Sequence, residues 1–128
     1  MSKYSGDPGY QAFRLLQIVF IVAPIVVGLD KFSSLLADWS SYLSPFVVKV
    51  VGTHQKLFLS LVGVIEVIVG VGVMFKPRFF ANIVAIWFAV IIINLLTIGH
   101  FFDIAIRDFG LMLSAIALSK LSRKYAEE

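Results

Sequence analysis

Four stretches of the chain are long enough and apolar enough to cross a lipid bilayer. A transmembrane helix needs about 20 mostly apolar residues. The hydrophobic pattern predicts such spans at about residues 11–29, 57–75, 79–99 and 102–119. The first three contain at most one charged residue each, whereas the fourth opens with "FFDIAIRDFG" and carries Asp103, Arg107 and Asp108. We therefore expect an all-α protein built as a bundle of four transmembrane helices.

The connections between the predicted spans differ in length. "FKPRFF" forms a tight turn between the second and third spans, where Pro77 ends one helix and begins the next. Residues 30–55 form the one long connection, and its apolar residues at helical spacing are Phe32, Leu35, Leu36 and Trp39. This spacing predicts a short amphipathic helix in the membrane interface that ends before Pro45, although a soluble cap over the bundle would show the same pattern.

Composition supports lipid as the main partner. Apolar residues make up 59% of the 128 and charged residues 15%, with a mean hydropathy of +0.94. A soluble domain usually has about 45–50% apolar and about 25% charged residues. The length suits one domain. We expect residues 1–128 to form a single integral membrane domain.

Charge and cysteine content exclude several function classes. The net charge is +3, but the eleven Lys and Arg are spread over loops and termini, which argues against nucleic-acid binding. The chain has no Cys, so disulfides and thiol chemistry within this chain are excluded. "MSKYSGDPGYQAF" lacks the positively charged start of a signal peptide, so we expect the first hydrophobic segment to be retained.

The distribution of basic residues predicts the orientation. Four spans place both termini and the "FKPRFF" turn on one side of the membrane. That side holds Lys3, Arg14, Lys76, Arg78, Lys120, Arg123 and Lys124, against Lys31, Lys49, Lys56 and Arg107 on the other. Because basic residues favour the cytoplasmic side, we expect both termini to be cytoplasmic.

The same topology gathers polar residues from distant parts of the sequence in the outer half of the bundle. An ionised side chain inside a membrane costs about 2.5 kcal/mol or more, so such groups should face the interior and pair. The predicted ligand-binding or proton-handling residues are Lys31, Glu66, Asp103, Arg107 and Asp108, with Arg14, Asp30, Asn94 and His100 as secondary candidates.

Helical spacing suggests which faces carry these groups. Asp103 and Arg107 are four residues apart and share a face, which continues through Gly110 and Ser114. The second span has a comparable stripe of Gly63, Glu66 and Gly70. Small residues of this kind suit close contact between helices.

These residues allow two readings. The cluster could bind a quinone headgroup, an anion or a proton, or it could be an ion-pair latch that only fixes helix order. His54 and His100 lie at helix ends without bis-His spacing, which argues against haem, and the absence of a Glu-x-x-His motif argues against a metal. No nucleophilic triad or phosphate-binding glycine loop is present, so no catalytic residue is predicted.

Three segments together resemble the DoxX family of small four-span membrane proteins: "FRLLQIVFIVAPIVVGLDKF", "LVGVIEVIVGVGVMFKPRFFA" and "FFDIAIRDFGLMLSAIAL". The likeness covers about residues 13–121. The family's characteristic positions correspond here to Arg14, Gly28, Lys31, Phe32, Glu66, Gly70, Asp103, Arg107 and Asp108.

The resemblance implies a fold and, more loosely, a role. The family is named after a small subunit of an archaeal thiosulfate:quinone oxidoreductase, which implies a bacterial or archaeal inner membrane and other subunits as partners. Some relatives use cysteines, which this chain lacks, so a redox role implies a bound quinone or a partner. The leading hypothesis is a quinone-linked oxidoreductase subunit, and the alternatives are a small transporter or proton conductor and a structural assembly subunit.

Overall fold

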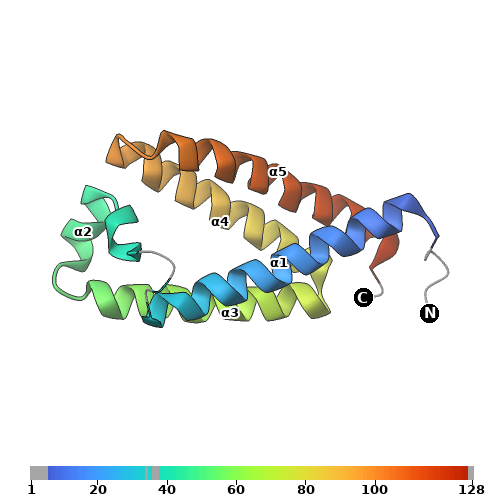
Figure 1. The fold of residues 1–128 in the computed structure, drawn as a ribbon, viewed down its shortest axis with the longest axis horizontal. Coiled ribbons are helices and arrows are strands. Elements are labelled where there is room, and N and C mark those ends of the chain that lie inside the picture. The colour runs from blue at the N-terminus through green and yellow to red at the C-terminus, as the bar shows by residue number, and fades with distance from the viewer. Residues whose placement is uncertain (1–5, 34, 36–37, 127–128) are drawn as a thin grey trace.

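The computed structural model describes residues 6–33, 35 and 38–126. Within these residues the protein is all-α, as predicted, and contains no strand. Its elements are α1 (Pro8–Ser33), the 3-10 helix η1 (Trp39–Tyr42), α2 (Pro45–Val51), α3 (Gln55–Phe75), α4 (Pro77–Ile98) and α5 (Phe102–Tyr125). Figure 1 shows their arrangement.

The long helices form two antiparallel pairs. α1 packs mainly on α3, and α4 packs mainly on α5. The pairs lie against each other at the end of the molecule that carries both termini, and they separate towards the opposite end (Figure 1). η1 and α2 lie at this open end, so the connection between α1 and α3 sits where the two pairs diverge.

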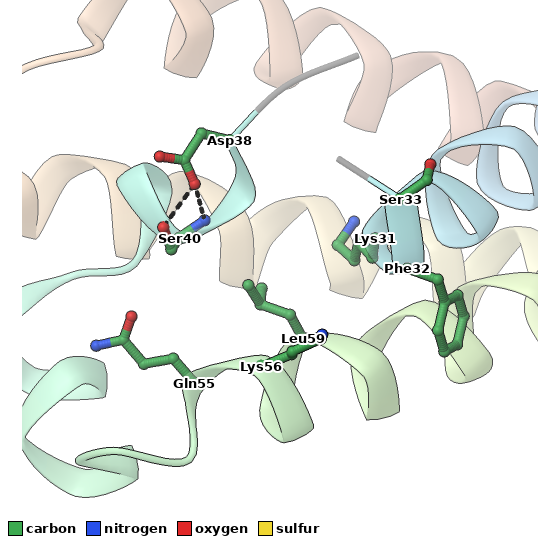
Figure 2. Close-up of a pocket in the computed structure, with 8 residues that line it drawn as sticks. All are labelled: Lys31, Phe32, Ser33, Asp38, Ser40, Gln55, Lys56 and Leu59. Carbon is green, nitrogen blue, oxygen red and sulfur yellow. Dashed lines mark hydrogen bonds between the residues drawn. The ribbon is translucent and has the colours of Figure 1, made fainter. Parts of the chain in front are cut away.

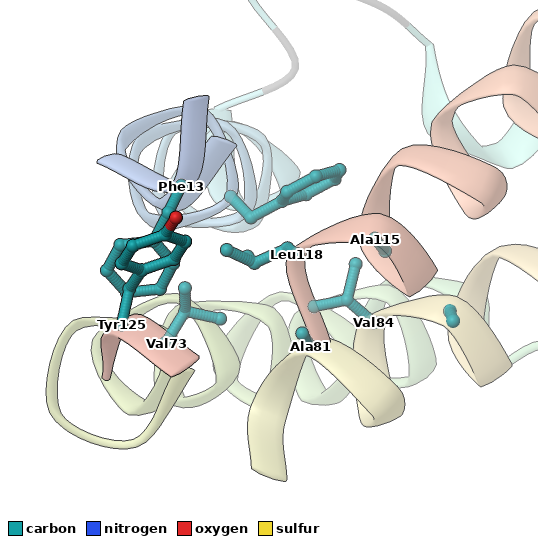
Figure 3. Packing of buried hydrophobic residues seen from close by; sticks show 9 residues of the cluster. Phe13, Val73, Ala81, Val84, Ala115, Leu118 and Tyr125 are labelled. Carbon is teal, nitrogen blue, oxygen red and sulfur yellow. The ribbon is translucent and has the colours of Figure 1, made fainter. Parts of the chain in front are cut away.

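The hydrophobic core fills the closed end of the bundle. Figure 3 shows that its side chains come from all four long helices: Phe13, Val73, Ala81, Val84, Ala115, Leu118 and Tyr125. Phe20 of α1 belongs to the same cluster. Ala81 and Ala115 are completely buried, and their short side chains let the helices that carry them approach closely.

Three helices are long and apolar enough to cross a membrane, judged by length and composition: α1, α3 and α4. Most of their surface is not covered by the rest of the chain, and large apolar side chains such as Leu15, Ile68 and Ile93 are exposed on it. These helices indicate a membrane protein, as predicted. α5 is of similar length, but Asp103, Arg107 and Asp108 interrupt its apolar character. By the same measure of length and composition, α5 is not among the helices that could cross a membrane.

The connection between α1 and α3 differs from the prediction. Phe32 belongs to the last turn of α1 and Trp39 begins η1, whereas Leu36 lies outside the described residues. Pro45 begins α2 rather than ending a helix. Proline suits the first helical position, where its missing N–H would have no partner, and the Ser44 side chain caps this turn by accepting from the Val47 N–H.

Candidate functional site

The centre of the candidate site is a buried ion pair between α1 and α3. Lys31 Nζ lies 2.6 Å from Glu66 Oε1, and the two side chains are only 8% and 10% exposed. The sequence placed both residues in the site, and the structure brings them together. A buried pair at this distance is a charge-assisted hydrogen bond shielded from water.

Glycines allow the two helices to approach closely beside this pair. A Cβ built on Gly28 would lie 2.6 Å from the Gly63 carbonyl oxygen, and one on Gly63 would lie 2.5 Å from the Gly28 carbonyl oxygen. A Cβ built on Gly70 would lie 2.8 Å from the Ile21 carbonyl oxygen of α1. The predicted stripe of Gly63, Glu66 and Gly70 therefore does form the face of α3 that packs on α1.

Trp39 covers the ion pair from the connection. Lys31 Nζ lies 4.2 Å from the centroid of the Trp39 ring, which is a cation–π contact. The indole Nε1–H donates to Asp30 Oδ2 at 2.8 Å. The sequence pattern predicted Trp39 only as an apolar residue of an interfacial amphipathic helix. The available signal was that an indole N–H in an apolar setting needs an acceptor, and Asp30 is a nearby carboxylate.

Asp30 itself organises the end of α1. It is buried, and its Oδ1 accepts from the Leu35 N–H at 3.0 Å and from the Ser33 hydroxyl at 3.3 Å. With the bond from Trp39, this carboxylate ties the chain beyond α1 back onto the helix. Asp30 thus holds Trp39 over Lys31.

A pocket of about 410 Å³ opens beside Lys31, below η1 and between the end of α1 and the start of α3 (Figure 2). Its lining residues are Lys31, Phe32, Ser33, Asp38, Ser40, Gln55, Lys56 and Leu59. Two ammonium groups and an amide provide hydrogen-bond donors, and Asp38 provides a carboxylate. The two hydroxyls already donate to Asp30 and Asp38, and Phe32 and Leu59 provide apolar walls. This volume lies within the range of small-molecule sites, about 300–1,000 Å³.

Asn94 fastens the connection to the other helix pair. Its Oδ1 accepts from the Ser44 N–H at 3.0 Å, and its Nδ2 donates to the Tyr42 carbonyl oxygen at 2.5 Å. The Tyr42 ring also lies 5.0 Å from that of Phe101, between centroids. The connection is therefore held at two points. Its Trp39 binds Asp30 of α1, and its backbone at Tyr42 and Ser44 binds Asn94 of α4.

The charges of α5 do not join the Lys31–Glu66 pair. Arg107 Nε lies 3.7 Å from Asp108 Oδ1, its side chain is 67% exposed, and no ion pair links Arg107 to Asp103 within the described chain. Asp103 and Arg107 do share a face, but α5 turns that face outwards and packs with the opposite side, which includes Ala105, Asp108 and Ala115.

The expected close contact along this face is also missing. Apart from its chain neighbours and the backbone of its own helix, no described residue has an atom within 4 Å of a Cβ built on Gly110. The Ser114 hydroxyl donates to the Gly110 carbonyl within the same helix. The prediction that this stripe packs against another helix is wrong for the described residues. Asp108 is buried on the packing side of α5 instead.

Two secondary candidates lie away from the pair. Arg14 donates to Gln17 Oε1 at 2.6 Å, and Gln17 Nε2 donates to the Val73 carbonyl oxygen at 3.2 Å, so both act at the closed end of the bundle. His100 is exposed and its ring contacts that of Phe101. Among the described residues, no group of three His, Asp or Glu side chains is placed to hold a metal.

Of the predicted site residues, the structure thus brings together Lys31, Glu66 and Asp30, with Trp39 added from the connection. No family model matches the sequence, and no curated protein and no solved structure matches it either.

Proposed function

We propose that the protein is a DoxX-like integral membrane subunit of a quinone-linked oxidoreductase assembly, and that its pocket binds a quinone headgroup. The observation that carries the proposal is the buried Lys31–Glu66 pair beside a 410 Å³ pocket. Ionisable side chains inside a membrane usually pair with one another, and they commonly mark sites that bind a substrate, an ion or a proton.

The residues of the pocket fit a quinone. Lys31 supplies an N–H donor for a carbonyl oxygen, and Phe32 and Leu59 supply apolar surface for the ring. Glu66, in contact with Lys31, can hold or release a proton. A bound quinone would supply the redox chemistry, while this chain binds the headgroup, orients it and handles a proton.

In this proposal α5 crosses the membrane as a fourth span and both termini lie in the cytoplasm of a bacterium or archaeon. Both termini lie at the same end of the bundle, as an even number of crossings requires (Figure 1). Asp103 and Arg107 lie in the first two turns of α5. From there their side chains can reach the lipid headgroups at the membrane surface.

The test is thermal unfolding of the detergent-purified protein with and without a short-chain quinone. Ligand at 100 times its Kd stabilises a protein by about 2.7 kcal/mol, so the melting temperature of the natural protein should rise by several degrees. Lys31→Met should lose this rise, and Arg107→Gln, on the outer face of α5, should keep it. No rise in the natural protein, or an equal rise in Lys31→Met, would contradict the proposal.

One observation favours a second function, a structural subunit in which the ion pair is only a latch. The pair lies one helical turn from Gly28 and Gly63, where the backbones of α1 and α3 touch. A latch would tolerate exchange of the two charges in Lys31→Glu/Glu66→Lys. The exchanged variant would lose no more stability than the cation–π contact with Trp39 supplies, about 0.5–2 kcal/mol, and quinone would have no effect on either protein. If quinone raises the melting temperature of the natural protein but not that of the exchanged variant, the result would favour the binding site.

A further inference from the structure

α2 presents an apolar surface that nothing in the described chain covers. Phe46 is 73% exposed and Val50 is 70% exposed. The two are four residues apart, so they lie on the same side of the helix. Val47 and Val51, by contrast, are only partly exposed and face the rest of the protein. Phe46 and Val50 therefore form the outer face of α2, whereas Val47 and Val51 form its inner face.

We propose that α2 docks into the headgroup region of the bilayer through Phe46 and Val50. We infer lipid as the occupant of this face because α3, which begins four residues after α2 ends, exposes apolar side chains at the same end of the bundle. Leu57 and Leu61 in the first turns of α3 are also exposed, and α3 is one of the helices apolar enough to cross a membrane. A single lipid surface can then cover both helices.

Several features place α2 at the interface rather than in the hydrocarbon. The helix has seven residues, whereas a span needs about 20. The chain leaves it through Gly52, Thr53 and His54, which are exposed, and exposed backbone groups of a turn need water or headgroups as partners. Lys49 is exposed beside the apolar pair, and its ammonium can reach lipid phosphate.

The segment is also held in a fixed position for such docking. Asn94 binds the backbone at Tyr42 and Ser44 immediately before α2, and the Ser44 side chain caps the helix. α2 lies across the end of the bundle where the two helix pairs separate (Figure 1). Docking therefore fixes the depth of the pocket entrance relative to the membrane surface.

The absence of cysteine makes a direct test available, because each introduced cysteine is unique. The full chain carrying Phe46→Cys or Val50→Cys is labelled with an environment-sensitive fluorophore. It is then reconstituted into vesicles of phosphatidylcholine and phosphatidylglycerol that contain spin-labelled lipids. Ile68→Cys, on the exposed side of α3, serves as the deep reference, and Arg123→Cys, at the charged end of α5, serves as the aqueous reference.

A lipid spin-labelled near the headgroup should quench both α2 probes at least about twice as strongly as one labelled near the chain end, since interfacial helices insert only shallowly. Ile68→Cys should show the reverse order. The proposal is overturned if the α2 probes resemble Arg123→Cys, or if the deep label quenches them most. It is also overturned if Phe46→Cys forms a disulfide between two copies in place of lipid contact, because the face would then bind a second chain.

Discussion

Lys31 on α1 and Glu66 on α3 form an ion pair, with 2.6 Å between Nζ and Oε1. Removal of either partner leaves a buried charge, so Lys31→Met or Glu66→Gln alone should destabilise the protein, by about 3 kcal/mol where the remaining group stays charged. The double variant should lose much less than the sum. Reversible unfolding in mixed micelles measures all three, and additive losses would contradict a direct coupling.

The contact between Gly28 and Gly63 predicts a cost for the smallest side chain. In Gly63→Ala the new methyl group would meet the Gly28 carbonyl oxygen at 2.5 Å, and both helices would have to move apart. We expect a loss of about 1–3 kcal/mol. Gly110→Ala is the matched control, because nothing described lies near its Cβ position and alanine should stabilise that helix by about 0.5–1 kcal/mol. Equal effects in unfolding experiments would refute the close crossing.

Asn94 should control the mobility of the connection. Asn94→Ala leaves the Ser44 N–H and the Tyr42 carbonyl without their partner. Hydrogen exchange should then become faster by at least about tenfold at η1 and α2, since a lost bond to a buried group costs about 1–3 kcal/mol. Asn82→Ala, which removes only a bond to the Arg78 carbonyl within α4, should leave exchange there unchanged.

The contact between Asp7 and Tyr125 predicts how stability depends on pH. The Tyr125 hydroxyl donates to Asp7 Oδ2 at 2.8 Å and the Gly9 N–H donates to Oδ1 at 2.9 Å. The Tyr125 hydroxyl, followed by the Gly9 N–H, lowers the pKa of Asp7 below its ordinary 3.8. The contribution of Asp7 is therefore complete above pH 3.8 and disappears as the pH falls through the lowered pKa.

The partner responds in the opposite direction. Hydrogen bonding to the Asp7 carboxylate, followed by burial, raises the pKa of Tyr125 above its ordinary 10.0. Its contribution is complete below pH 10.0 and is lost as the pH rises through the raised pKa. Tyr125→Phe should weaken both pH dependences in melting experiments, whereas Tyr42→Phe, at the opposite end of the bundle, should not. An unchanged acid limb in Tyr125→Phe would contradict the contact.

Part of the candidate site was predictable from the sequence. Lys31 and Glu66 are ionisable residues in or at the ends of apolar segments, and such residues need partners. The connection was not predictable in the same way. Trp39 binds Asp30, and Asn94 binds the backbone of the connection. No periodicity of the sequence encodes these contacts. Pro45 was misread because proline both ends and begins helices, and only the Ser44 cap distinguishes the two.

The long apolar helices, the tight turn at Pro77 and the residues that share each helix face follow from the order of residues alone. The direction in which those faces turn follows from how the helices pack. The stripe of Gly63 and Glu66 faces α1, whereas the stripe of Asp103 and Arg107 faces outwards. In a soluble protein apolarity would indicate the inner face, but here lipid accepts apolar side chains as readily as the core does. The orientation of each helix therefore depends on close packing and on the pairing of buried charges.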